Sequence, residues 1–112
     1  MITHVLSSIV AERLPDSDPQ KPVLLAYAKA FEAKYGPRNT FGGHAWDALQ
    51  LVFKALEKVG PDRAKIRDVL ETTKNFVGIS GVFDFSPTEH NGLDRRAVTM
   101  VEIVNGEWHL AR

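Results

Sequence analysis

The sequence predicts an α+β fold, in which about three helices precede a short strand and a C-terminal β-hairpin. Apolar residues recur at three- and four-residue steps between positions 20 and 73, which is the spacing of amphipathic helices. Beyond Asn75 the apolar residues are mainly β-branched or aromatic, and glycines interrupt the chain. Asn105 and Gly106 then supply the dipeptide most typical of a tight hairpin turn.

Length and composition fit one globular domain. The 112 residues are 44% hydrophobic and 25% charged, and fourteen basic residues balance fourteen acidic ones. This balance argues against nucleic acid or anionic lipid as a partner. The chain contains no cysteine, which excludes disulfides and thiolate chemistry. The first ten residues are apolar but lack a basic stretch, so they do not resemble a signal peptide, and an exported parent protein would carry its signal upstream.

The first third of the chain predicts an extended segment followed by a helix. Residues 3–11 are rich in β-branched side chains and suggest a strand or an extended entry segment. Two prolines and two aspartates in residues 14–19 predict a turn, with Asp18 as the helix cap and Pro19 as the first helical residue. The helix should cover residues 20–35 and bury one face, formed by Leu24, Tyr27, Ala28, Phe31 and Tyr35.

Two further helices are predicted in the middle of the chain. Gly36-Pro37 ends the first helix, and residues 38–43 form a loop. The second helix, residues 44–59, should be central to the core because its apolar stripe is wide, comprising Ala45, Ala48, Leu49, Val52, Ala55, Leu56 and Val59, with Trp46 and Phe53 beside it. Gly60-Pro61 ends it, and a third helix over residues 62–73 begins at Asp62 as its cap.

The last third of the chain predicts extended structure. A strand should begin after Gly81, and residues 86–94 form a turn-rich connection. Residues 97–104 and 107–111 should pair as a hairpin around Asn105-Gly106.

Candidate catalytic and metal-ligating residues do not form a pattern. His44 and Asp47 lie one helical turn apart, but the other histidines are dispersed, which argues against a zinc site. Glu89 and Asp94 fall in a surface turn without a partner for acid–base catalysis, and the serines lack the Gly-x-Ser-x-Gly context of a nucleophile. We therefore expect no enzymatic activity, no metal and no cofactor.

Two glycine-containing loops are candidates for ligand binding. Gly78-x-x-Gly81 has the form of a phosphate or RNA-backbone loop, but its flanks lack basic residues, so a sharp bend between a helix and a strand is favoured. The loop 39–44 leads into a helix N-terminus, where free amides and the helix dipole suit a polar or anionic ligand. Phe41 either projects into a pocket or packs the helix start against the core. The sequence leaves both alternatives open.

Four segments, in a fixed order over nearly the whole chain, carry a family resemblance. They are residues 15–19 with the helix that ends at Tyr35 and Gly36, Ala45-Trp46-Asp47-Ala48, a short charged helix leading into Phe76-x-Gly78-x-x-Gly81-x-Phe83-x-Phe85, and His90-x-Gly92 with two strands around Asn105-Gly106-Glu107-Trp108. The chain resembles the C-terminal part of a periplasmic solute-binding protein of the leucine/isoleucine/valine-binding type, the type I receptors of ABC transporters. By this resemblance it is a fragment of a larger protein.

The resemblance implies a bilobed α/β fold with a ligand cleft between the lobes. It implies that residues 1–87 form part of the first lobe, and that residues 88–112 form a crossover and a hairpin of the second lobe. It places Phe41 against the apolar side chain of the ligand, with Gly42, Gly43 and His44 beside it. The ligand would be a small polar molecule: a branched-chain amino acid, an amide or an aromatic acid.

The same resemblance implies the partners and the location. The parent protein would be a periplasmic or extracellular receptor, without enzymatic activity, that delivers its ligand to the permease of an ABC importer. The groups that hold the ligand's carboxylate and ammonium would come from earlier parts of the receptor, so this chain alone should bind ligand weakly or not at all.

The resemblance also implies unpartnered apolar surface. Without the rest of the receptor, the faces that bear Trp46, Leu49 and Phe53 would lack a partner. We therefore expect the isolated chain to form homo-oligomers, for which exchange of the C-terminal hairpin is one route. An alternative function is a small self-contained α+β interaction module that homodimerises through that hairpin.

Overall fold

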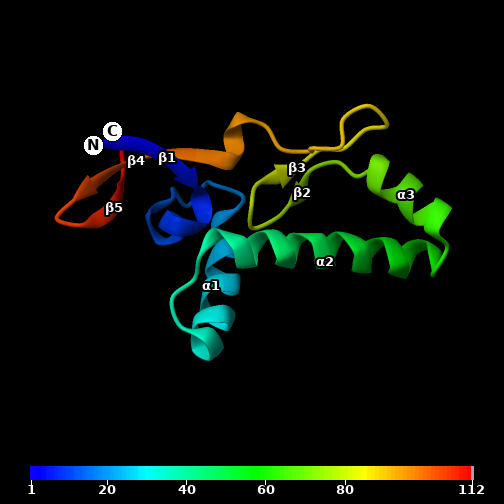
Figure 1. Ribbon diagram of the computed structural model, residues 1–112, viewed down its shortest axis with the longest axis horizontal. Coiled ribbons are helices and arrows are strands. Elements are labelled where there is room, and N and C mark those ends of the chain that lie inside the picture. Colours follow the sequence, from blue (N-terminus) through cyan, green and yellow to red (C-terminus); the bar gives the residue numbers. More distant parts are fainter. Residues whose placement is uncertain (112) are drawn as a thin grey trace.

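The protein is elongated, with its two ends side by side at one tip (Figure 1). The computed structural model describes residues 1–111, and the chain measures 51 × 32 × 23 Å along its principal axes. Its radius of gyration is 15.5 Å, above the roughly 13 Å of a compact domain of this length. The elements, in chain order, are β1 (Ile2–Leu6), η1 (Ser7–Arg13), α1 (Lys21–Tyr35), α2 (Thr40–Val59), α3 (Arg63–Glu71), β2 (Phe76–Val77), β3 (Val82–Phe83), η2 (Arg95–Ala97), β4 (Val98–Val104) and β5 (Glu107–Leu110).

The tip that holds both ends is a three-stranded antiparallel sheet. Its strand order is β1-β4-β5, with Thr3 opposite Val101. Asn105 and Gly106 turn the chain between β4 and β5 with φ values of 52° and 81°, which confirms the predicted hairpin. The extended segment predicted for residues 3–11 is correct only as far as Leu6, because the chain then turns into the 3₁₀ helix η1.

Helix α1 begins slightly later than predicted. Gln20 is the residue that flanks the helix, and Pro22 lies within the first turn, where a missing N–H costs nothing. Asp18 does not cap the helix: its Oδ1 accepts from the Gln20 amide at 2.9 Å within the preceding turn. Leu24, Tyr27 and Ala28 are buried as expected, whereas Tyr35 is 72% exposed.

Helix α2 begins at Thr40, four residues before the predicted start. Asn39 makes this possible, since its Oδ1 accepts from the amides of Phe41 at 3.0 Å and Gly42 at 3.2 Å. The predicted loop through Gly43 is therefore the cap and first turn of a helix.

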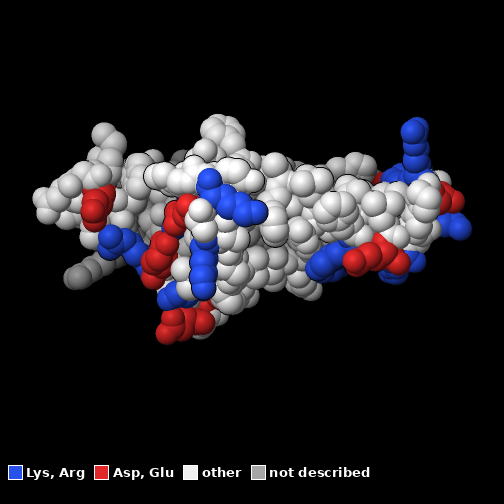
Figure 2. Space-filling model, turned by 90° about the horizontal axis from the view of Figure 1, so that it is seen from below, with Lys and Arg blue, Asp and Glu red and all other residues white. Residues whose placement is uncertain are grey.

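The prediction that α2 is central to the core is wrong for most of its apolar stripe. The buried residues of the helix are Gly43, Asp47 and Ala55, while Leu49 is 53% exposed and Phe53 is 51% exposed. Figure 2, which views the molecule from below, shows an uncharged area between one group of charged side chains left of centre and another towards the right end.

The remaining elements form a small unit on the other side of α2. Asp62 caps α3 as predicted, because its Oδ1 accepts from the Lys65 amide at 3.1 Å. The strand after Gly81 is present, but a partner strand, β2, precedes it and pairs with it antiparallel. The Gly78 amide donates to the Gly81 carbonyl at 2.9 Å, so these glycines form the turn of a hairpin and not a helix-to-strand connection.

The core joins the sheet, η1, α1 and the β2–β3 turn. Its buried cluster comprises Val10, Ala11, Leu14, Leu24, Tyr27, Ile79 and Val101. Helices and antiparallel strands thus share one core, which confirms the predicted α+β class.

The Arg38 side chain fastens the α1–α2 connection to η1. Its Nε donates to the Ser8 carbonyl at 2.8 Å, and its two terminal nitrogens donate to Glu32 at 2.8 Å and Glu12 at 2.6 Å. The hydrogen bond from Arg38 lowers the pKa of Glu12 below its ordinary value of 4.5.

We predict that Glu12→Gln removes a pH-dependent contribution to stability. Because the folded-state pKa of Glu12 is lowered, ionised Glu12 stabilises the fold above pH 4.5, and this contribution disappears as the pH falls through the lowered pKa. The carboxylate is partly exposed, so we expect a difference of less than about 1 kcal/mol at pH 7. Denaturant unfolding of both proteins from pH 7 to pH 3 measures it. Glu57→Gln, outside this network, is the control, and a difference that persists at pH 3 would contradict the assignment.

Candidate functional site

A buried carboxylate joins the start of α2 to the β2–β3 turn. Asp47 is 2% exposed, and its Oδ1 and Oδ2 accept from the backbone amides of Ile79 and Ser80, each at 2.7 Å. Charge-assisted bonds of this kind offset the cost of burying a carboxylate. The turn approaches so closely that a Cβ on Gly78 would lie 2.7 Å from the Asp47 Oδ1. Asp47 therefore fixes the position of the turn against the helix.

A second polar contact joins the same two segments. The Nδ1 of His44 lies 2.8 Å from the Oγ of Ser80, whose side chain is buried, while the His44 ring is exposed. Beside this contact, Gly43 packs against Ile79, and a Cβ on Gly43 would come 2.6 Å from the Ile79 Cγ2. The first turn of α2 thus has a rigid support beneath it.

Phe41 lies at the exposed end of this turn. Its side chain is 80% exposed, so it does not pack the helix start against the core. The amides of Phe41 and Gly42 already donate to Asn39, which removes two of the free amides on which the anion-binding hypothesis depended. Phe41 instead offers an apolar ring at the surface.

A groove of about 540 Å³ adjoins Gly42 between α1 and α2. It is mainly apolar, includes four aromatic side chains, and is lined by Tyr27, Ala30, Phe31, Lys34, Tyr35, Gly42, Ala45, Trp46 and Leu49. The Tyr27 hydroxyl is buried without a hydrogen-bond partner among the described residues, and a Cβ on Gly42 would lie 2.5 Å from it. Burial, together with the negative charge of Asp47, raises the pKa of the Tyr27 hydroxyl.

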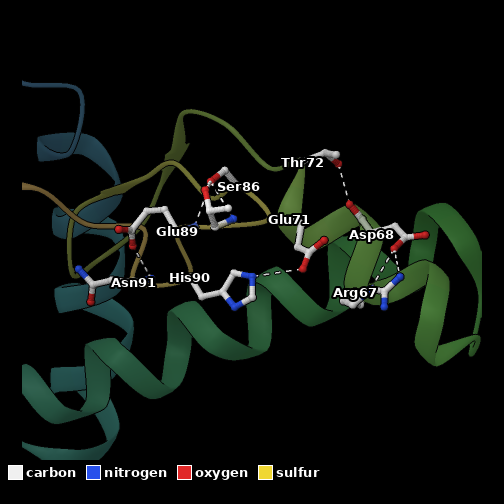
Figure 3. Close-up of polar contacts among 9 residues, drawn as sticks. Arg67, Asp68, Glu71, Thr72, Ser86, Glu89, His90 and Asn91 are labelled. Atoms are coloured by element: carbon white, nitrogen blue, oxygen red, sulfur yellow. Dashed lines mark hydrogen bonds and ion pairs between the residues drawn. The ribbon is translucent and has the colours of Figure 1, made fainter.

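A second groove, of about 490 Å³, lies between α2 and α3. It is apolar inside, and His90 and Glu71 meet at its rim with Nε2 3.2 Å from Oε1 (Figure 3). Glu89, on the same loop, accepts from the amides of Asn91 at 2.6 Å and Gly92 at 3.1 Å, so its carboxylate caps a turn. Asp94 likewise accepts from the Arg96 amide, at 2.8 Å.

These acidic groups do not converge on a shared point. Among residues 1–111, no group of three or more histidine, aspartate or glutamate side chains is placed to hold a metal ion. In the same part of the chain, no helix has the length and apolar character needed to cross a membrane.

The four residues predicted to contact ligand are consecutive but face different surroundings. Phe41 and His44 are exposed, Gly42 packs against Tyr27, and Gly43 is buried against Ile79. Sequence reasoning did not find the supporting pair, Asp47 and Ser80. The sequence did contain one signal, because Asp47 lies next to the apolar stripe of a predicted helix. A carboxylate in that position is expected to be hydrogen-bonded if it is buried.

Comparison with known proteins decides the family. The family profile described as "Periplasmic binding protein" matches residues 7–107. The chain belongs to the periplasmic binding protein family. Solved structures of such receptors share its fold, which confirms the resemblance that the sequence motifs carried. No curated protein sequence matches the chain.

Three solved structures illustrate the similarity. An extracellular ligand-binding receptor from Rhodopseudomonas palustris HaA2 is 29% identical, with a TM-score of 0.83 over 100% of this chain and 34% of that one. A putative branched-chain amino acid ABC transporter from Rhodospirillum rubrum is 24% identical, with a TM-score of 0.66 over 88% of this chain and 29% of that one. A leucine binding protein from Thermotoga maritima is 22% identical, with a TM-score of 0.67 over 100% and 30%. The latter two share the fold alone.

This periplasmic binding protein chain therefore spans about one third of the length of the structures it matches (34% of the R. palustris receptor). The division into lobes at residues 87 and 88 stays a prediction. In the structure β1 pairs with β4, so the first strand of the chain lies in one sheet with the C-terminal hairpin.

We predict that Asp47→Ala lowers the free energy of unfolding by about 3 kcal/mol, because the buried amides of Ile79 and Ser80 would both lose their acceptor. Asp47→Asn, which keeps one acceptor oxygen, should cost less. Urea denaturation measures both, and Asp68→Asn, which alters an exposed pair with Arg67, should change stability by less than about 0.5 kcal/mol. Equal stabilities of Asp47→Ala and Asp68→Asn would show that the carboxylate does not fasten the turn.

Proposed function

We propose that this chain is part of an extracytoplasmic solute-binding receptor that delivers a small polar ligand to an ABC importer. The ligand class is a branched-chain amino acid, an amide or an aromatic acid. Membership of the periplasmic binding protein family supports the proposal, as do the descriptions of similar structures as an extracellular ligand-binding receptor and a leucine binding protein. The proposal rests mainly on one observation. The Phe41 ring is exposed in the first turn of α2, and Asp47 of the same helix binds the β2–β3 turn.

In this proposal Phe41 covers the apolar part of the ligand. The ring is 80% exposed, and covering a phenylalanine side chain contributes about 1.5–3 kcal/mol. Asn39 caps the helix directly beneath the ring, and His44 lies one turn further on the same surface. Gly42 and Gly43 serve as the packed base of the site, because neither position has room for a side chain.

The rest of the binding site would lie outside this chain. A ligand with a carboxylate and an ammonium needs charged or well-oriented polar partners once water is excluded. We propose that the other two thirds of the receptor supply these groups, that the ligand-bound receptor engages the importer's permease, and that the receptor works in the periplasm or outside the cell without catalysing a reaction. The isolated chain would then bind ligand weakly or not at all.

The exposed apolar face of α2 fits a helix that another part of the receptor covers. Trp46, Leu49 and Phe53 are 43%, 53% and 51% exposed on one helix, next to two apolar grooves. Monomeric soluble proteins rarely leave such a continuous apolar surface open. We propose that the rest of the receptor covers this face, and that the isolated chain covers it by self-association.

The second candidate function is an interaction module that homodimerises through the C-terminal hairpin. One observation favours it: Met100, Ile103 and Trp108 on β4 and β5 are 54%, 41% and 38% exposed. However, β4 is already paired on both sides, by β1 and β5, so the strand has no free edge. An exchanged hairpin would first have to break the β1–β4 pairing.

We predict that Phe41→Ala weakens ligand binding roughly ten- to hundredfold in a receptor that carries this chain, because the ligand loses an apolar contact surface. Thermal-shift screening against amino acids, amides and aromatic acids identifies the ligand, and calorimetry measures its affinity. Trp108→Ala, a partly exposed aromatic on β5 that lines neither groove, is the control. Unchanged affinity in Phe41→Ala would remove Phe41 from the pocket, and a receptor that no compound stabilises would contradict the proposed function.

We predict that the isolated chain is at least dimeric at high micromolar concentration, and that Leu49→Lys combined with Phe53→Lys shifts it to monomer, because two charges would interrupt the apolar face of α2. Size-exclusion chromatography with light scattering measures the mass. Met100→Lys combined with Ile103→Lys places two charges on the C-terminal hairpin and tests whether the chain associates through that surface instead. Dissociation by the hairpin variant alone would favour the interaction module, and a monomeric wild-type chain would contradict self-association.

A further inference from the structure

The His44 ring is held by one of its nitrogens and free at the other. Nδ1 lies 2.8 Å from the Ser80 Oγ, and no residue in the range 1–111 makes a hydrogen bond with Nε2. The ring is exposed on the same turn of α2 as Phe41, three residues further along the chain. Residues at this spacing are neighbours on a helix surface, so the His44 and Phe41 side chains project from adjacent positions.

The burial of Ser80 decides the direction of this hydrogen bond. Ser80 is 2% exposed, and among residues 1–111 the Nδ1 of His44 is the only hydrogen-bond partner of its hydroxyl. A hydroxyl has one proton to donate, and a buried donor left without an acceptor costs about 1–3 kcal/mol. This cost is avoided when the hydroxyl donates to Nδ1, and in that direction Nδ1 carries no proton.

Asp47 keeps the Ser80 hydroxyl in place. Its Oδ2 accepts from the Ser80 amide at 2.7 Å, and its Oδ1 holds the neighbouring amide of Ile79 at 2.7 Å. The carboxylate thus fixes the backbone from which the hydroxyl projects. The chain of contacts runs from a buried acid through a buried serine to an exposed imidazole.

We propose that the Ser80 hydroxyl donates to Nδ1 of His44 and so places the ring proton on Nε2, and that this N–H donates to a carboxylate or carbonyl oxygen of the ligand whose apolar part contacts Phe41. The ligand role rests on the proposed function, whereas the tautomer does not. An imidazole whose Nδ1 accepts a hydrogen bond carries its proton on Nε2, and that nitrogen can then only donate. Ser80 is a positioning residue, because it acts through His44 and does not touch the ligand.

The tautomer is measured on this chain without ligand. Long-range ¹H–¹⁵N NMR distinguishes a protonated ring nitrogen from an unprotonated one, and we expect the proton of His44 on Nε2. Ser80→Ala should move the His44 nitrogen shifts towards those of a mixture of tautomers. Ser7→Ala is the matched control, since Ser7 is also buried but pairs with Thr99, at 2.7 Å. A proton on Nδ1 in the wild-type chain, or identical His44 shifts in Ser80→Ala and the wild type, would overturn the inference.

A double-mutant cycle in a receptor that carries this chain tests the ligand role, with L-leucine and benzoate as probes. His44→Ala should weaken binding of the recognised probe roughly tenfold, as expected for one lost hydrogen bond to a charged oxygen. Ser80→Ala should weaken it less, and should have no further effect once His44 is alanine. Equal losses from Ser80→Ala in both backgrounds would mean that Ser80 is only structural. If the wild-type receptor binds neither probe, both the proposed function and the ligand role of His44 are contradicted. The tautomer measurement is independent of this outcome and still tests the link between Ser80 and His44.

Discussion

The bond between the Asp47 carboxylate and the β2–β3 turn is the interaction on which the arrangement of this chain depends. It connects two segments more than thirty residues apart, since Asp47 binds Ile79 and Ser80 across separations of 32 and 33 residues. The turn carries Ile79 into the main core, and the helix carries Phe41 and His44 to the surface. One buried carboxylate therefore joins core packing to the candidate site, and it connects two of the four segments that carry the family resemblance, Ala45-Trp46-Asp47-Ala48 and Phe76-x-Gly78-x-x-Gly81.

Local signals in the sequence were sufficient for the elements that local chemistry determines. The end of α1 at Gly36, the cap at Asp62 and the hairpin at Asn105-Gly106 depend on backbone preferences of a few neighbouring residues. The start of α2 was missed because two glycines disfavour a helix, by roughly 1 kcal/mol each. Tertiary contacts override that preference, since the close approach of Tyr27 to Gly42 and of Ile79 to Gly43 leaves no room for a Cβ.

The ligand contacts of Phe41 to His44 stay a prediction, and the local geometry of these residues could be predicted only in part for a related reason. Family resemblance placed Phe41 to His44 near the ligand, but it did not distinguish a buried Phe41 from an exposed one. In the structure Asn39 starts the helix early, and the Phe41 side chain is 80% exposed. The contact between Ser80 and His44 could not be predicted, because the two residues are 36 positions apart and the spacing of residues in a single sequence does not indicate such a contact. The spacing of the apolar residues on α2 was predicted correctly, but spacing does not show whether they are buried, and Leu49 and Phe53 are 53% and 51% exposed.

The pairing of β1 with β4 has a consequence for how the chain folds. It brings together residues 92 to 100 positions apart, from Leu6 opposite Val98 to Ile2 opposite Glu102. Closing so large a loop costs entropy before any pairing compensates for it, and contacts of this kind slow folding. The β4–β5 hairpin and the α2–α3 pair need only short loops, so they can form early. The three-stranded sheet would then be completed last, and the order of assembly would run opposite to the order of the strands in the chain.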